Sequence, residues 1–158
     1  MTDRICIHIN TKNRPTYLAV TLASVLGQTF QNWDLIIMDA SNEPAVNDET
    51  VGRLLTTVRR YGHKVSYERD NSLGIAQTYQ KMLELSDTPL CLRMEDDVWW
   101  EPEMLARLYE VMEARPEVAA CGMMTPHYAS SGLVDPTPEK LRNGFSYALS
   151  NRGNVLIS

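Results

Sequence analysis

Short apolar runs alternate with segments of helical periodicity through the first 124 residues of the chain. Short apolar runs predict strands at 5–9, 33–38, 89–94 and 118–124. The continuous run at 35–38 predicts that the second of these is buried on both faces of a sheet. The run at 64–68 alternates polar with apolar residues and predicts an edge strand. Between the runs, apolar residues recur every three or four positions and predict helices. These helices begin near Pro15, Asp48, Gly74 and Pro102. The order predicts an α/β fold, with a mostly parallel sheet flanked by helices.

The pattern weakens after residue 124, where turn-forming residues become frequent. Two short runs, at 145–149 and 155–157, predict further strands. We therefore expect a single domain, with a regular α/β core at residues 1–124 and an irregular region at 125–158.

Composition and charge narrow the class of protein. A chain of 158 residues with 44% hydrophobic and 22% charged residues suits one globular domain. Its net charge of −5 disfavours nucleic acid as a partner, because polyphosphate backbones repel an acidic surface. The sequence shows neither an apolar run long enough to span a membrane nor a secretory signal at its start, and its three cysteines have no paired spacing. These features predict a cytoplasmic protein.

Polar residues follow the predicted strands at one consistent end. Residues 10–14 follow the first strand, Asp39 ends the second, Asp70 and Asn71 follow the third, and residues 95–97 follow the fourth. Ligands of open α/β sheets bind outside the carboxyl ends of the strands. If the first and fourth strands are neighbours, these side chains converge on one edge of the sheet.

The acidic triplet Glu95, Asp96 and Asp97 points to a cation. Adjacent carboxylates repel one another unless a positive charge compensates them, and oxygen ligands suit Mg²⁺ or Mn²⁺. Strand alternation predicts Glu95 and Asp97 on one side and Asp96 on the other. The alternative is that Asp96 and Asp97 cap the next turn or face solvent.

Common nucleotide and hydrolase motifs are absent from the sequence. It contains no G-x-G-x-x-G after the first strand and no phosphate-binding G-x-x-x-x-G-K-[ST] loop. It also lacks a G-x-S-x-G nucleophile elbow and an H-E-x-x-H helix. A phosphate ligand would then be held by metal and side chains.

The stretch from about residue 5 to 126 resembles the nucleotide-binding half of a glycosyltransferase family 2 domain, which has the GT-A fold. Five landmarks match in order: residues 9–15, 24–30 and 33–39, the pair Asn71 and Gly74, and the acidic triplet at the position of the D-x-D metal motif. The resemblance implies that residues 125–158 are a remnant of the acceptor side, so that the chain is short of a full acceptor-binding half.

The resemblance also implies roles for individual residues and an inverting transfer of sugar from a nucleoside-diphosphate sugar to an acceptor hydroxyl. Asp97, with Glu95, would bind Mn²⁺ or Mg²⁺, and Asp96 would contact the ribose or the donor sugar. Asp39 would lie beside the base or ribose. The other residues implied in donor binding are Thr11, Lys12, Asn13, Arg14, Asn71 and Gly74. The donor that the resemblance favours is a UDP-sugar.

The chain departs from the family pattern in several places. Lys12 and Ala40 stand where many members have a base-stacking aromatic residue and a base-reading Asp. Asp135 and Glu139 are the only carboxylates left as catalytic base after the predicted fifth strand. These departures leave open a truncated module that binds a nucleotide or partner without catalysis. A shortened acceptor side also predicts self-association.

Four further residues have structural interpretations. His8, in mid-strand, is expected to be a hydrogen-bonded core residue, and His63 is expected to face solvent after a helix-ending glycine. Trp99 and Trp100 are expected to pack under the fourth helix, with stacking on a sugar ring as the alternative.

Overall fold

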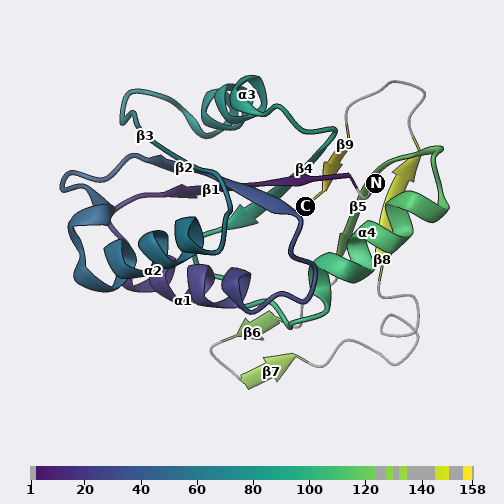
Figure 1. Ribbon diagram of the computed structural model, residues 1–158, viewed down its shortest axis with the longest axis horizontal. Helices are drawn as coiled ribbons and strands as arrows, with labels where there is room; N and C mark the ends of the chain where they lie inside the picture. Colours follow the sequence, from purple (N-terminus) through teal and green to yellow (C-terminus); the bar gives the residue numbers. More distant parts are fainter. Residues whose placement is uncertain (1–2, 124–126, 130–131, 135–144, 150–154, 158) are drawn as a thin grey trace.

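The computed structural model describes residues 3–123, 127–129, 132–134, 145–149 and 155–157. Its centre is a parallel sheet that confirms the predicted α/β class (Figure 1). The strand order is β3 (Val65–Arg69), β2 (Trp33–Asp39), β1 (Ile5–Thr11), β4 (Leu90–Glu95) and β9 (Val155–Ile157). The chain runs outward from β1 to β3 and then returns to the other side of β1 with β4. This reversal marks the β1–β4 boundary as the place where ligands of such sheets bind.

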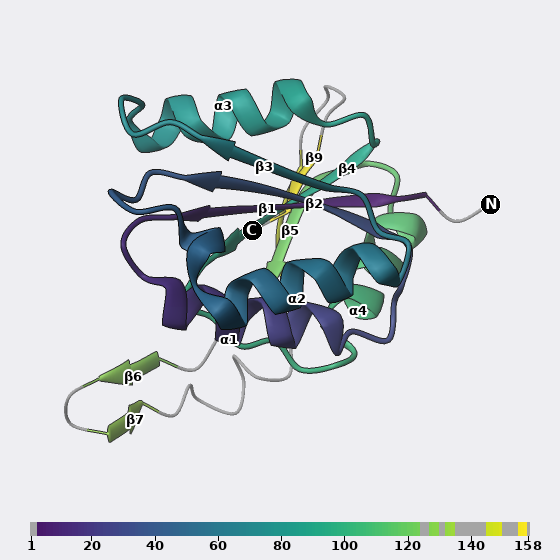
Figure 2. The ribbon, with the colours of Figure 1, turned by 60° about the vertical axis from the view of Figure 1, so that its left-hand side comes forward.

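Helices cover the two faces of the sheet unequally (Figure 2). On one face lie α1 (Pro15–Leu26), α2 (Glu49–Arg60) and α4 (Met104–Ala114), and on the other lies α3 (Ile75–Leu85). Ile5, Ile7 and Ile9 alternate along β1 and pack into the larger core under the three helices. Cys6 points to the smaller α3 face, where Met38 and Met82 join it. Burial on both faces explains why the central strands have continuous apolar sequence.

Local signals set the ends of the helices. Pro15 occupies the first turn of α1, where its missing N–H costs nothing. The Asp48 carboxylate caps α2 by accepting hydrogen bonds from the backbone N–H of Thr50 and Val51. Gly62 adopts φ +90° after α2, a conformation that other residues reach only with strain. A single 3₁₀ turn, η1 (Ala45–Asn47), precedes α2. Helix α2 begins directly after Asp48, where the sequence predicts a helix start.

The predicted fifth strand does not extend the parallel series. β5 (Val118–Met123) pairs antiparallel with β8 (Phe145–Leu149) in a separate two-stranded sheet. The position beside β4 is filled instead by β9, which comes from the predicted strand at 155–157. Two short strands, β6 (His127–Ala129) and β7 (Gly132–Val134), pair antiparallel and lie between β5 and β8 in the sequence.

His63 is buried, so the expectation that it faces solvent is wrong. Its ring stacks on Trp33, with 3.5 Å between ring centroids and 8° between planes. Its Nδ1 lies 2.8 Å from the Trp33 carbonyl oxygen. The positive φ of Gly62 turns the chain back, so that the next residue reaches the start of β2.

His8 is the hydrogen-bonded core residue that the sequence predicts. It is buried, and its Nε2 lies 2.6 Å from the Ser86 hydroxyl oxygen. The Ser86 hydroxyl donates to the Met82 carbonyl oxygen at 2.8 Å, so the consistent arrangement has His8 donating to Ser86. Burial lowers the pKa of His8 from its usual 6.5 to about 4.

The shifted pKa of His8 predicts a loss of stability in mild acid. Below pH 6.5 the unfolded chain binds a proton that folded His8 excludes, so the free energy of unfolding falls as the pH drops toward 4. The full loss from this group is about 3 kcal/mol. Urea titrations at several pH values should show a flatter pH dependence for His8→Gln than for the wild type. Identical slopes in the two proteins would contradict the assignment.

Candidate functional site

The carboxyl ends of β1, β2 and β4 bring the strand-end polar residues to one edge of the sheet. In the parallel register, Thr11 is the partner of Asp39 on one side, and Asn10 is the partner of Glu95 on the other. Strands β1 and β4 are therefore neighbours, as expected. The edge formed by their carboxyl ends is the candidate site.

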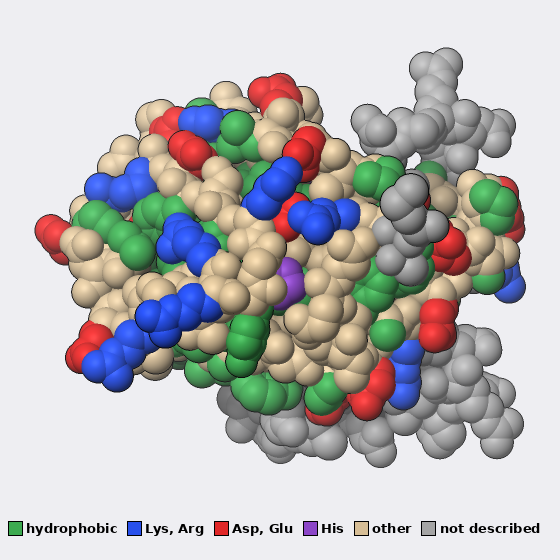
Figure 3. All heavy atoms as spheres, in the orientation of Figure 1, with side chains coloured by type: hydrophobic (Ala, Val, Ile, Leu, Met, Phe, Trp, Pro, Cys, Tyr) green, Lys and Arg blue, Asp and Glu red, His purple; other side chains and the backbone are tan. Residues whose placement is uncertain are grey.

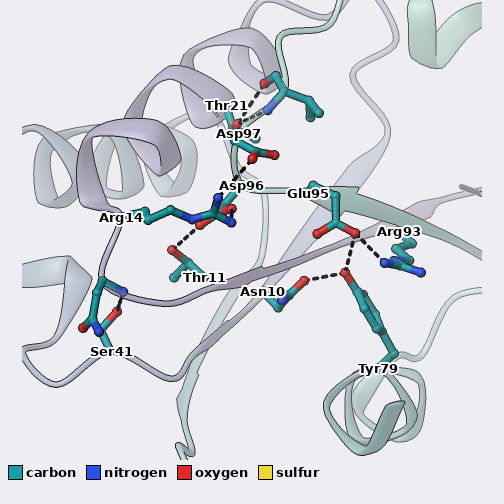
Figure 4. Close-up of polar contacts among 12 residues, drawn as sticks. Asn10, Thr11, Arg14, Thr21, Ser41, Tyr79, Arg93, Glu95, Asp96 and Asp97 are labelled. Atoms are coloured by element: carbon teal, nitrogen blue, oxygen red, sulfur yellow. Dashed lines mark hydrogen bonds and ion pairs between the residues drawn. The ribbon is translucent and has the colours of Figure 1, made fainter. Parts of the chain in front are cut away.

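Asp96 and Asp97 share one arginine (Figure 4). Asp96 has no exposed surface; its Oδ2 accepts a 2.7 Å hydrogen bond from the Thr11 hydroxyl, and its Oδ1 accepts one from Arg14 Nη2. Arg14 Nη1 donates to Asp97 Oδ2 at 3.0 Å. The Asp97 side chain is 42% exposed. The expectation that Glu95 and Asp97 lie on one side of the strand and Asp96 on the other is therefore wrong, because β4 ends at Glu95 and strand alternation stops there.

Burial dominates the acid–base behaviour of Asp96. Loss of solvation raises the pKa of its carboxyl group, and the nearby charge of Asp97 raises it further. The hydrogen bond from Thr11 and the charge of Arg14 act in the opposite direction but do not cancel the rise. Arg14 and Thr11 are thus the groups that favour the ionised form of this buried carboxylate.

Glu95 belongs to a separate network on the α3 side of the sheet. Arg93 Nη2 lies 2.5 Å from Glu95 Oε1, so the arginine within β4 pairs with Glu95. The Tyr79 hydroxyl, from α3, donates to Asn10 Oδ1 and lies 3.4 Å from Glu95 Oε1. The Arg93 guanidinium also lies 4.3 Å from the centre of the Tyr79 ring. Figure 4 shows this network apart from the Arg14 group.

The loop between β1 and α1 is held in a strained shape that presents Arg14. Asn13 has φ +57°, which a residue with a side chain adopts at a cost. Its backbone N–H donates to the Ser41 hydroxyl at 2.7 Å, and its side-chain oxygen accepts from the Asn42 N–H at 2.9 Å. These contacts from the loop after β2 fix the backbone that carries Arg14.

Asp39 organises that second loop. One carboxylate oxygen accepts from the Ser41 N–H at 2.8 Å, and the other accepts from the Ala45 N–H at 2.7 Å and from the Tyr67 hydroxyl. Burial alone would raise the pKa of Asp39, but the hydrogen bonds from Ser41, Tyr67 and Ala45 outweigh it and lower the pKa. Asp39 is therefore ionised and fully engaged by the protein.

A cavity of about 290 Å³ opens beside Asp39, between the ends of β2 and β3. Its lining residues are Asp39, Ser41, Arg69, Asp70, Asn71 and Ser72. Arg69 Nη2 donates to the Ser41 carbonyl oxygen at 2.8 Å and so ties the two walls together. The predicted residues Asp39 and Asn71 thus meet at one cavity.

The remaining predicted residues lie elsewhere. Lys12 is exposed, and Gly74 forms the N-cap of α3, where its N–H donates to the Gln77 side chain. Asp135 and Glu139 lie outside the described residues. Within the part of the chain that the structure describes, no three acidic, histidine or cysteine side chains come together as a ready-made metal cage.

The two tryptophans after the acidic triplet have opposite environments. Trp100 packs in the core and contributes to the cluster with α4, as expected. Trp99 is 60% exposed, so the expected core packing fails for this residue. The Val98 backbone between β4 and Trp99 is held by the Thr21 hydroxyl of α1.

Sequence reasoning missed the residues that shape the two loops. Ser41, Tyr67 and Arg69 were not predicted, although each has a distinct contact at the site. The D-x-S spacing of Asp39 and Ser41 is the one local signal, because an aspartate often binds the backbone N–H two residues on.

Two surface features accompany the site. Acidic side chains lie next to basic ones on the face seen in Figure 3. The ion pairs of the described residues include Arg93–Glu95 and Lys81–Asp70. Among the helices that the structure describes, none combines the length and apolar character needed to cross a bilayer.

Known proteins are similar to this chain in sequence or in fold. Protein CgeD of Bacillus subtilis (strain 168) is 25% identical over 130 residues, which are 76% of this chain and 29% of that protein. The S. aureus TarS crystal structure superposes with a TM-score of 0.64 at 17% identity, over 85% of this chain and 23% of that one. The mannosyltransferase PcManGT from Pyrobaculum calidifontis, in complex with GDP-Man and Mn²⁺, gives 0.68 at 16% identity, over 80% and 36%.

The solved structures show that the fold is GT-A, and the chain spans less than two fifths of the length of each of these relatives. The family model described as "Glycosyl transferase family 2" matches residues 6–155, nearly the whole sequence. On that match, the chain belongs to glycosyltransferase family 2.

Proposed function

We propose that the chain transfers a sugar from a nucleoside-diphosphate sugar to an acceptor hydroxyl, with inversion and with help from a divalent metal ion. The observation that carries the proposal is the buried Asp96, which is held with Asp97, Thr11 and Arg14 at the sheet edge. Family membership supports glycosyl transfer in general.

Solved neighbours support a nucleotide-sugar donor. TarS residues 1–349 have been solved in complex with UDP-GlcNAc, and PcManGT with GDP-Man. We propose that the nucleoside occupies the cavity beside Asp39 and Asn71, with Lys12 and Asn13 on the approach. Asp39 would then act by shaping the cavity wall, because the protein already engages both of its oxygens. A UDP-sugar remains the donor that we propose.

The carboxylates at the end of β4 are suitable ligands for Mn²⁺ or Mg²⁺. Mg²⁺ is commonly held by one or two carboxylates together with substrate phosphates. Asp97, which is partly exposed, supplies one such carboxylate at the end of β4. Glu95 is the proposed second ligand, and it would join only after its ion pair with Arg93 opens. A bound ion would neutralise charge on the departing nucleoside diphosphate.

The chain's own residues would orient the donor and accept the proton. Asp96 is the proposed partner of a sugar or ribose hydroxyl, and its Oδ2 would exchange the Thr11 hydroxyl for that group, because both of its oxygens are engaged and the side chain is buried. The Arg14 guanidinium matches the geometry of phosphate oxygens. A carboxylate would take the proton from the acceptor hydroxyl as that oxygen attacks the anomeric carbon. Asp135 and Glu139 remain the proposed candidates for this base.

One observation favours a second function, a module that binds a nucleotide or partner without catalysis. Lys12 and Ala40 stand where many family members have a base-stacking aromatic residue and a base-reading Asp. The chain spans 23–38% of the length of the solved neighbours. Hydrolysis of a donor sugar by the isolated chain, abolished by a chelator, would exclude this second function.

Metal-dependent nucleotide binding tests the proposed function. Calorimetry with UDP, and with GDP as comparison, should show binding that strengthens when Mn²⁺ is present. Asp97→Asn should remove the Mn²⁺-dependent part, because the amide is a weaker ligand, while leaving the melting temperature nearly unchanged at this exposed site. The matched control is Asp87→Asn, an exposed carboxylate paired with Lys64. If neither nucleotide binds the wild type with Mn²⁺, the proposed function is wrong.

Asp39→Asn should affect both stability and nucleotide binding. The amide nitrogen would face N–H and O–H donors, which we expect to cost about 2 kcal/mol in unfolding free energy. Loss of the loop shape should also weaken UDP binding more than Tyr67→Phe does, because the phenylalanine removes one donor only. Chemical denaturation and calorimetry measure the two effects. Wild-type values for both quantities in Asp39→Asn would contradict this role.

We also propose that the chain self-associates. Trp99, Tyr17 and Val20 are large apolar residues with exposed side chains. Light scattering over a range of concentrations should show species heavier than the monomer. A strict monomer at high concentration would exclude the proposal.

A further inference from the structure

Arg14 occupies the place where a compensating cation is needed. The acidic triplet calls for positive charge, and the structure supplies it from within the chain: Arg93 pairs with Glu95, and Arg14 pairs with both Asp96 and Asp97. The two carboxylates that pair with Arg14 differ in burial. Asp96 has no exposed surface, whereas Asp97 and Arg14 are 42% and 44% exposed. The bond to Asp97 is therefore the weaker one, since solvent screens it.

The backbone of Arg14 is fixed independently of its side chain. Asn13 is anchored by Ser41 and Asn42, and the Arg14 carbonyl oxygen accepts from the Leu18 N–H at 3.1 Å as the first bond of α1. The guanidinium thus extends from a rigid loop and can change partner by rotation of its side chain alone.

We propose that Arg14 is a built-in competitor of the divalent cation: it neutralises Asp97 in the free protein and releases it when a diphosphate arrives. This inference rests on the proposed function, since it describes how that site would be loaded. Planar guanidinium groups bind phosphate oxygens and carboxylates with similar geometry. A donor diphosphate therefore offers Arg14 a replacement for Asp97, while Asp96 keeps hold of Nη2. The freed Asp97 carboxylate is then available to the cation.

The consequence is positive coupling between nucleotide and metal. Each ligand removes a cost that the other would meet alone, and linkage requires that the two enhance each other's affinity by the same factor. Without nucleotide, a cation has to displace Arg14 from Asp97. Without the cation, a diphosphate has to approach two carboxylates that share a single positive charge.

Mn²⁺ binding without nucleotide tests the inference directly. The free Mn²⁺ signal in electron paramagnetic resonance gives the dissociation constant at fixed pH and ionic strength. The wild type should bind Mn²⁺ weakly, and Arg14→Met should bind it about tenfold more tightly, the scale expected for removing one charge in contact with a partly exposed carboxylate. In the double variant Arg14→Met with Asp97→Asn, this gain should disappear.

Arg53→Met is the matched control. It removes the same charge from an exposed pair with Glu49 on α2 and leaves Arg14 and the Arg93–Glu95 pair intact. Its Mn²⁺ affinity should stay close to that of the wild type. An equal gain in both variants would overturn the inference, because general electrostatics would then explain cation binding. No gain in folded Arg14→Met would overturn it as well.

A second measurement tests the coupling between UDP and Mn²⁺, and circular dichroism checks that each variant folds. UDP should raise the Mn²⁺ affinity of the wild type by a larger factor than that of Arg14→Met. Should the methionine variant fail to fold by circular dichroism, Arg14→Lys serves instead, since a lysine keeps one charge but not the two-pronged contact, and it should give a smaller gain. If Arg14→Met gains Mn²⁺ affinity while UDP does not bind the wild type, the proposed function fails and the competition stands. If UDP binds with Mn²⁺ but Arg14→Met gains no Mn²⁺ affinity, the competition by Arg14 fails and the proposed function stands.

Discussion

The burial of the Asp96 carboxylate is the constraint on which the site depends. A charged group without exposed surface is tolerated only with hydrogen bonds and a counter-charge. Here Thr11 comes from the end of β1 and Arg14 from the loop that follows, so both partners exist only if β1 and β4 are neighbours. The parallel pairing that builds the sheet also creates the polar edge. Fold and site are therefore determined by the same contact.

The loop after β2 has a comparable role on the other side of β1. Asp39 fixes residues 41 and 45 through their N–H groups, and Ser41 in turn fixes Asn13. A chain of hydrogen bonds thus runs from the end of β2 to the backbone that carries Arg14. Strain at Asn13 is sustained by these contacts, which is why a left-handed conformation occurs at a residue with a side chain.

The predictable part of this protein is local in sequence. Continuous apolar runs and helix-start residues such as Pro15 and Asp48 place the strands and helices within a few residues, since each signal acts within a turn or two. The strand next to β4 was not predictable in this way, because β9 lies about sixty residues further along the chain. The same holds for Arg14: it is over eighty residues from Asp96, and no periodicity indicates which side chain will compensate a distant carboxylate.

Compensation from within the chain changes how the acidic triplet is understood. In sequence, three adjacent carboxylates point to a cation that compensates their repulsion. In the structure, Arg93 and Arg14 divide the triplet into two separately paired groups on different sides of the sheet edge. Two of the three carboxylates are therefore compensated within the chain, and under the proposed function a cation would be favoured by something that arrives with it. A diphosphate meets that requirement, because its oxygens both attract Arg14 and complete a metal's coordination shell. Under the proposed function, metal binding would be a property of the protein–nucleotide complex, and the free site would keep one carboxylate more than its two arginines compensate.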